Sequence, residues 1–185
     1  LGLRAGDQEP IGILGCQTWA RQQPPMPKKD RRKYAHQART TGKESDRWNA
    51  AIDAVEGRCH DAAPLIHVVD REGDQYRLMS NVIARGSFFV VRAQHDRKVS
   101  GKQTIWGAIE DAQVIFDREV ALSRRRPKHK RAAHGPRDAR VAKLGVSATP
   151  LEIERSRAPG NEGTPATLSE NVVRVAEMNP PKSRS

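Results

Sequence analysis

Two short apolar runs separated by a helix-length segment constrain the fold of this chain more than any other feature. Residues 65–69 (LIHVV) and 88–91 (FFVV) are rich in β-branched and aromatic side chains, which is typical of strands buried on both faces of a sheet. The segment between them can begin a helix near Asp74 and end it at Gly86. A strand, a helix and a strand form a βαβ unit, so the pattern predicts two parallel neighbouring strands with a right-handed crossover.

Asp70 directly follows the first of these predicted strands. In open α/β sheets the carboxyl ends of the strands form the edge at which ligands bind. A carboxylate at the end of a buried strand is costly unless it binds a cation or is well hydrogen-bonded. Two interpretations of Asp70 therefore stand side by side: a cation ligand, and a structural cap of the following helix.

The flanking sequence predicts further elements. Residues 10–20 contain a short apolar run that predicts a buried strand, and a helix is expected from Ser45 to Gly57, with Trp48 on its apolar face. Residues 141–154 predict one or two antiparallel strands, and residues 172–175 a last short strand. The expected fold class is α/β, with a partial core over residues 1–98 and a basic β-rich subdomain over residues 99–185 that is truncated at its end.

The charge balance predicts a polyanionic partner. The chain has 33 Lys and Arg against 22 Asp and Glu, which gives a net charge of +11 and a pI near 10.3. This is the electrostatic signature of a nucleic-acid-binding protein, although a solvated basic protein without such a role has the same composition. The richest basic run lies within residues 123–140, where DNA contact and a merely solvated loop are both open interpretations.

Several classes of protein are excluded or disfavoured. No stretch approaches the roughly 20 apolar residues that a membrane-spanning helix needs, and residues 1–10 lack the apolar region of a secretory signal. Cys16 and Cys59 suggest neither a zinc site nor a disulfide framework, and they fit a reducing cytoplasm. Because the chain begins with Leu, we expect it to be processed or to be a fragment of a longer protein.

Several ordered segments resemble the IS4/Tn5 family of DDE transposases, which have an RNase H-like fold. The sequence VVDREGDQY at residues 68–76 resembles the DREAD-type motif around the second catalytic aspartate of that family, and FFVVRAQHDR at residues 88–97 resembles its next core strand. Residues 10–21, 44–48 and 176–181 are similar to further family segments in the same order. The resemblance implies a partial RNase H-like core with an inserted antiparallel β-rich subdomain.

The resemblance also implies a chemistry and a set of site residues. In the family, three carboxylates hold two Mg²⁺ ions for phosphoryl transfer on transposon-end DNA. Asp70 matches the second carboxylate and is the expected catalytic residue and metal ligand. Basic side chains after the two strands are expected to contact the DNA backbone, which positions a duplex without reading its sequence. These residues are Arg71, Arg92, His95, Arg97 and Lys98.

Two parts of the family pattern have no counterpart in this sequence. The first catalytic aspartate belongs on a strand before residues 10–20, where Asp7 lies in an unlike polar stretch. The third carboxylate belongs to a helix with a Tyr-Arg-Glu-Lys signature, and no Tyr occurs after Tyr76. One carboxylate holds Mg²⁺ weakly at best. We therefore expect this chain to be a truncated, inactive portion of a transposase.

The expected partners follow from this interpretation. DNA at the transposon ends is the predicted partner, a homodimer is implied for the complete protein, and no membrane association is expected. A bacterial cytoplasmic location at the nucleoid fits a DNA partner. The alternative is a non-catalytic basic nucleic-acid-binding protein or an inhibitor of transposition, in which Asp70 is a plain helix cap.

Overall fold

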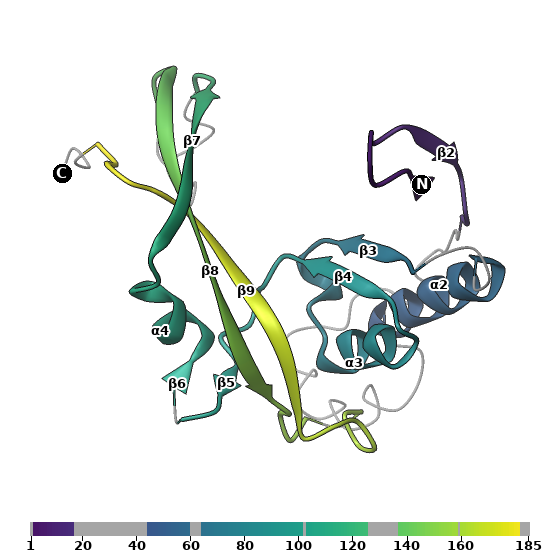
Figure 1. The fold of residues 1–185 in the computed structure, drawn as a ribbon. Helices are drawn as coiled ribbons and strands as arrows, with labels where there is room; N and C mark the ends of the chain where they lie inside the picture. Colours follow the sequence, from purple (N-terminus) through teal and green to yellow (C-terminus); the bar gives the residue numbers. More distant parts are fainter. Residues whose placement is uncertain are drawn as a thin grey trace, which may run out of the picture. The chain divides into compact units, whose positions relative to one another are not determined.

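The computed structural model describes residues 2–16, 44–59, 64–101, 103–125, 137–158 and 160–181. The chain divides into two compact units (Figure 1). The first unit contains Leu1–His95 and Arg155–Pro165, and the second contains Asp96–Glu154 and Ala166–Ser185. The architecture is mixed α/β. None of the helices within the described ranges is long and apolar enough to cross a membrane.

The first unit contains the predicted βαβ arrangement. Strands β3 (Ile66–Val69) and β4 (Phe88–Val91) pair in parallel, in the register that sets Ile66 opposite Phe88. Between them lie the short 3-10 helix η2 (Arg71–Gly73) and helix α3 (Tyr76–Ala84). Gly86 follows α3 with a φ of 72°, a left-handed conformation that favours glycine. The parallel pairing and the end of the helix at Gly86 are therefore confirmed.

The prediction that both faces of these strands are buried is wrong for the described residues. Helices α2 (Glu44–Cys59) and α3 lie on one side of the β3–β4 pair (Figure 1), where Ile52, Leu78 and Val82 form a core with Trp48 and Phe89 packed against it. On the other face the alternate side chains are exposed. These are Ile66, Val68, Phe88 and Val90, with exposed fractions from 54% to 76%.

Helix α2 extends beyond its predicted end. It runs through Gly57 and ends at Cys59, because Gly57 does not adopt the left-handed conformation that closes a helix. A glycine inside a helix costs about 1 kcal/mol relative to alanine, which packing of the helix can offset. The Arg58 guanidinium, in the last turn, donates a hydrogen bond to the Leu14 carbonyl.

The N-terminal residues form a small hairpin in place of the predicted buried strand at residues 10–20. Strand β1 (Gly2–Leu3) pairs antiparallel with β2 (Pro10–Gly12). Ile11 and Ile13 are 66% and 78% exposed, because the hairpin pairs with no other described strand. Residues 17–20 of the predicted strand lie outside the described residues.

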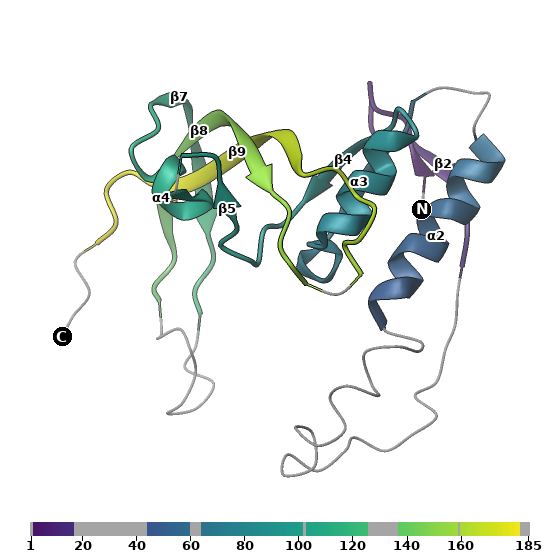
Figure 2. The same ribbon diagram turned by 90° about the horizontal axis from the view of Figure 1, so that it is seen from below.

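The second unit is an antiparallel sheet with one short helix. Its elements are β5 (Lys98–Val99), β6 (Gln103–Thr104), α4 (Ile105–Glu110), β7 (Val114–Leu122), β8 (Arg140–Glu154) and β9 (Thr167–Glu177). The strand order is β6-β5-β8-β7, and β9 also pairs with β8. Strands β7 and β8 pair antiparallel, with Leu122 opposite Arg140, and run side by side (Figure 2). The predicted antiparallel β-rich region is confirmed, and residues 141–154 form a single strand.

The core of the second unit lies where α4 meets this sheet. Its buried apolar side chains come from β5, α4, β8 and β9, and they are Val99, Ile105, Ile109, Ile153 and Leu168. The Ser147 hydroxyl donates to the Ala112 carbonyl, and the Arg174 guanidinium donates to the Glu110 carbonyl. These bonds fasten the end of α4 and the turn after it to the sheet.

The chain returns to the first unit after β8. Residues 155–165 belong to that unit, and the Tyr76 hydroxyl donates a hydrogen bond of 3.1 Å to the Pro165 carbonyl. The Arg155 guanidinium also donates to the Thr164 carbonyl, at 2.6 Å. The sequence analysis predicts a single boundary at residue 98, and it does not predict that residues 155–165 belong to the first unit.

Candidate functional site

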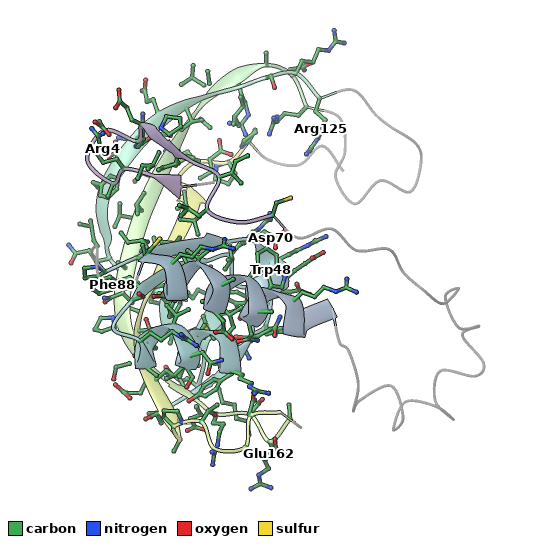
Figure 3. The ribbon with its side chains drawn as sticks, turned by 90° about the vertical axis from the view of Figure 1, so that its right-hand side faces the viewer. Arg4, Trp48, Asp70, Phe88, Arg125 and Glu162 are labelled. Atoms are coloured by element: carbon green, nitrogen blue, oxygen red, sulfur yellow. The ribbon has the colours of Figure 1, made fainter. Side chains whose placement is uncertain are left out.

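Asp70 lies at the carboxyl end of β3, as predicted, and its side chain is exposed (Figure 3). Its carboxylate oxygen Oδ1 accepts a hydrogen bond of 2.9 Å from the Glu72 backbone N–H, so Asp70 caps the short helix η2. Asp70 is therefore a cap of the turn that follows its strand, and its role as a cation ligand stays a prediction. Among the described residues, no hydrogen bond or ion pair involves the second oxygen, Oδ2.

Gly73 allows the chain to turn tightly after Asp70. A Cβ atom at this position would lie 2.6 Å from Cγ2 of Val69, which is closer than real Cβ atoms approach. Gly73 is itself buried against the end of β3. The loop that carries Asp70 is therefore folded back on its own strand, and only glycine permits that approach.

Arg92 leaves the neighbouring strand at the same edge of the sheet. Its backbone N–H donates the last ladder hydrogen bond to the Val69 carbonyl, at 3.4 Å. In the register Val91 lies opposite Val69, so Arg92 and Asp70 each follow the last paired residue of their strand, and the Arg92 side chain is exposed. The predicted proximity of an acidic and a basic residue at the carboxyl edge holds for the backbone positions of Asp70 and Arg92.

Asp74 links the two loops, and the sequence analysis did not identify it as a site residue. It is 5% exposed, and its Oδ2 atom accepts hydrogen bonds from the backbone N–H groups of Gln94 at 2.6 Å and His95 at 2.8 Å. The helix predicted to begin near Asp74 starts at Tyr76, after a 3-10 turn. The sequence shows an acidic residue four positions after Asp70, but it does not show the partners of that residue, which lie some 20 residues away in the chain.

The remaining predicted DNA-contact residues divide between the two units. Arg71 and His95 are exposed and lie in the loops after β3 and β4. Arg97 and Lys98 belong to the second unit, where the Arg97 carbonyl accepts from the Ile105 backbone N–H and Lys98 pairs with Thr104. Their expected location beside Asp70 stays a prediction.

The described residues offer few ligands for Mg²⁺. Asp70 provides one exposed carboxylate at the sheet edge, and the described part of the chain contains no group of three or more His, Cys, Asp or Glu that could hold a metal ion. Mg²⁺ requires near-octahedral oxygen coordination. The described residues alone therefore do not fit a two-metal centre.

A buried hydrogen bond between a histidine and a glutamate lies under the β3–β4 sheet, and the sequence analysis missed it. His67 of β3 and Glu56 of α2 approach to 2.6 Å between Nε2 and Oε1, with side chains 11% and 6% exposed. Burial raises the pKa of Glu56, but hydrogen bonds from His67 and Ser87 and the nearby positive charges outweigh it, so the pKa is lowered overall. This pair faces the helices rather than the carboxyl edge, so we assign it to the packing of the first unit.

The charged groups of the second unit are arranged along its strands. Arg140 and Glu177 form a bidentate pair between β8 and β9, and hydrogen bonding to Arg140 lowers the pKa of Glu177. The backbones of Arg125 and Arg137 form an isolated antiparallel β-bridge beyond the ends of β7 and β8. Residues 126–136, which hold half of the Lys and Arg residues of the predicted basic run, lie outside the described residues. DNA contact by that run stays a prediction.

No protein-family model matches the chain, and no curated protein matches it.

Proposed function

We propose that this chain is part of a DNA transposase of the IS4/Tn5 DDE type, acting on transposon-end DNA. The observation that carries the proposal is the carboxyl edge of the β3–β4 pair, where an exposed Asp70 and an exposed Arg92 follow adjacent parallel strands. The sequence around these two residues is the part that resembles the family. The βαβ arrangement covered by α2 and α3 supports a partial RNase H-like core.

Each residue has a role in this proposal. Asp70 contributes one carboxylate to a magnesium centre whose other carboxylates the described residues do not supply. Together with carboxylates from outside the described residues, Asp70 would hold Mg²⁺, which would supply charge stabilisation for phosphoryl transfer. Arg71, Arg92 and His95 contact phosphates, which holds the duplex at the sheet edge. The net charge of +11 supports an anionic partner.

Binding to DNA is the first test. The chain should bind a mixed-sequence duplex with an affinity that falls steeply as salt rises, measured by fluorescence anisotropy. Arg92→Gln should weaken binding and reduce the salt slope by about 1. Arg4→Gln is the matched control, because Arg4 is already ion-paired with Asp7 at 2.9 Å and Glu9 at 3.5 Å. Equal affinities for wild type and Arg92→Gln would contradict the predicted role of Arg92.

Catalysis needs a separate test, on a reading frame extended in both directions at the DNA level. Asp70→Asn is the informative variant, because asparagine caps helices about as well as aspartate but removes the carboxylate charge that a metal requires. An extended protein with this change should keep end binding and lose Mg²⁺-dependent end cleavage. Retained cleavage would exclude Asp70 as a metal ligand.

A second candidate is favoured by the cap bond of Asp70. A non-catalytic nucleic-acid-binding protein, or an inhibitor of transposition, needs Asp70 only to accept the Glu72 N–H. This candidate predicts that the extended reading frame lacks both an upstream Asp-bearing strand and a downstream Tyr-Arg-Glu-Lys helix. It also predicts that Asp70→Asn changes neither stability nor DNA binding.

A further inference from the structure

Asp74 is a buried carboxylate to which the proposed chemistry gives no task. A buried ionised group is stable only when its oxygen atoms are well hydrogen-bonded. A single oxygen of Asp74 accepts two backbone N–H groups, from Gln94 and His95, at 2.6 and 2.8 Å. Hydrogen bonds to a charged acceptor are roughly twice as strong as bonds between neutral groups. Asp74 therefore holds the backbone of Gln94 and His95 in place through strong hydrogen bonds.

These hydrogen bonds connect the two loops that follow the adjacent strands β3 and β4. Asp74 ends the loop that begins at Asp70 after β3, and Gln94 and His95 lie in the segment that leaves β4 at Arg92. The last ladder bond between the strands, from Arg92 to Val69, is long at 3.4 Å. Beyond that bond, the two contacts to Asp74 restrain the path of residues 92–95.

We propose that Asp74 is a positioning residue, which holds residues 92–95 in one conformation so that Arg92 and His95 meet the DNA backbone beside Asp70. This inference rests on the proposed function. A segment that is already ordered loses less conformational entropy when it binds, so the hydrogen bonds to Asp74 raise affinity without touching DNA. Asp74 itself is too buried to contact a phosphate, and its negative charge would repel one.

The direction in which one substitution changes DNA affinity distinguishes a positioning role from a long-range electrostatic effect. Asp74→Asn removes a negative charge near the proposed DNA site, so charge alone predicts tighter binding. Positioning predicts the opposite, a dissociation constant about tenfold higher, because the asparagine oxygen can still accept both N–H groups but without the charge that strengthens those bonds. Glu72→Gln is the matched control, because it also removes one negative charge, from an exposed side chain two residues before Asp74. Its affinity should be unchanged or slightly higher.

A double-mutant cycle tests whether Asp74 acts through the segment it holds. If Asp74 positions Arg92, then Asp74→Asn in an Arg92→Gln background should weaken binding much less than it does in the wild type. A purely structural role predicts equal effects in both backgrounds. The salt slope gives a second readout, because Asp74→Asn should reduce it by about 1, as Arg92→Gln does.

Amide hydrogen exchange tests the hydrogen bonds to Asp74 without DNA. In the wild type, the amides of Gln94 and His95 should be protected, and Asp74→Asn should speed their exchange at least about tenfold. The Phe88 amide, which donates to the Leu65 carbonyl at 2.7 Å, is the internal control. Unprotected Gln94 and His95 amides in the wild type would overturn the proposal even if Asp74→Asn failed to fold.

The outcomes distinguish the two proposals. A wild-type chain that shows no salt-dependent DNA binding overturns the proposed function, and the positioning role falls with it. A wild-type chain that binds DNA, together with an Asp74→Asn variant that binds equally or more tightly, overturns the positioning role alone. Weaker binding by Asp74→Asn, with normal binding by Glu72→Gln and a non-additive cycle, supports it.

Discussion

The parallel strand pair of the first unit and the antiparallel sheet of the second place their charged side chains differently. In the first unit, Asp70, Asp74 and Arg92 follow the ends of β3 and β4. In the second unit, the charged pairs lie along the strands, as in Arg140–Glu177 and Lys143–Asp117. The first arrangement gathers loops at one edge, and the second distributes charge over a sheet.

Topology explains the difference. The strands of a βαβ unit run the same way, so the loops that follow them emerge at a single edge and can form a site there. Antiparallel strands joined by a hairpin end alternately at opposite edges, so their cross-strand pairs contribute to the sheet itself. The chemistry proposed for this chain therefore belongs to the first unit, which also contains the buried contact between His67 and Glu56.

The largest expected effect comes from the core of the first unit. Leu78→Ala removes a fully buried side chain that packs with Ile52 and Val82, and it should lower the free energy of unfolding of this unit by about 3 kcal/mol. Chemical denaturation measures the loss. Ile83→Ala, on the same helix but 39% exposed, is the control and should cost less than about 1 kcal/mol.

The same variant also tests whether the two units are independent. Hydrogen exchange in β3 and β4 should accelerate in Leu78→Ala, whereas the amides of the β8–β9 ladder should keep their protection. Equal acceleration in both sheets would show that the units unfold together. The two units would then have no separate free energies of unfolding to compare.

A middle-sized effect is expected from the buried hydrogen bond between His67 and Glu56. Glu56→Gln removes the charge that faces His67 and should cost about 1–3 kcal/mol, read from the same denaturation experiment. Because the pKa of Glu56 is lower in the folded chain, its stabilisation is present above the unfolded-state pKa and is lost as pH falls through the folded-state pKa. The variant should therefore lose less stability than the wild type on acidification. Parallel acid-unfolding curves would contradict this.

The smallest effect is expected in the second unit. Glu177→Gln breaks the bidentate pair with Arg140, whose hydrogen bond raises the pKa of Arg140 and lowers that of Glu177. Both side chains are partly exposed, so water and salt screen the pair. The thermal midpoint of the second unit should fall slightly, by less than Glu56→Gln lowers that of the first, and the difference should shrink at high salt. A larger fall would place the main electrostatic stabilisation in the antiparallel sheet.

Local patterns in the sequence were sufficient for the order of elements in the first unit. Two β-branched runs, a helical segment between them and Gly86 predicted the parallel pair, because strand and helix periodicities are local properties of a chain. The position of Asp70 after its strand followed from the same pattern. The predicted burial failed over residues 10–16, the described part of the predicted strand, because burial depends on which other elements cover a strand, and the hairpin β1–β2 has no such cover among the described residues.

The sequence by itself determined the βαβ order, the antiparallel character of the later strands and the basic charge, since each follows from neighbouring residues or from composition. Only the tertiary structure decided that Asp74 holds Gln94 and His95, that Glu56 pairs with His67, and that Arg140 pairs with Glu177. Each of these contacts joins residues that lie far apart along the chain or on different elements. No local periodicity reports such contacts, because they form only when the elements pack.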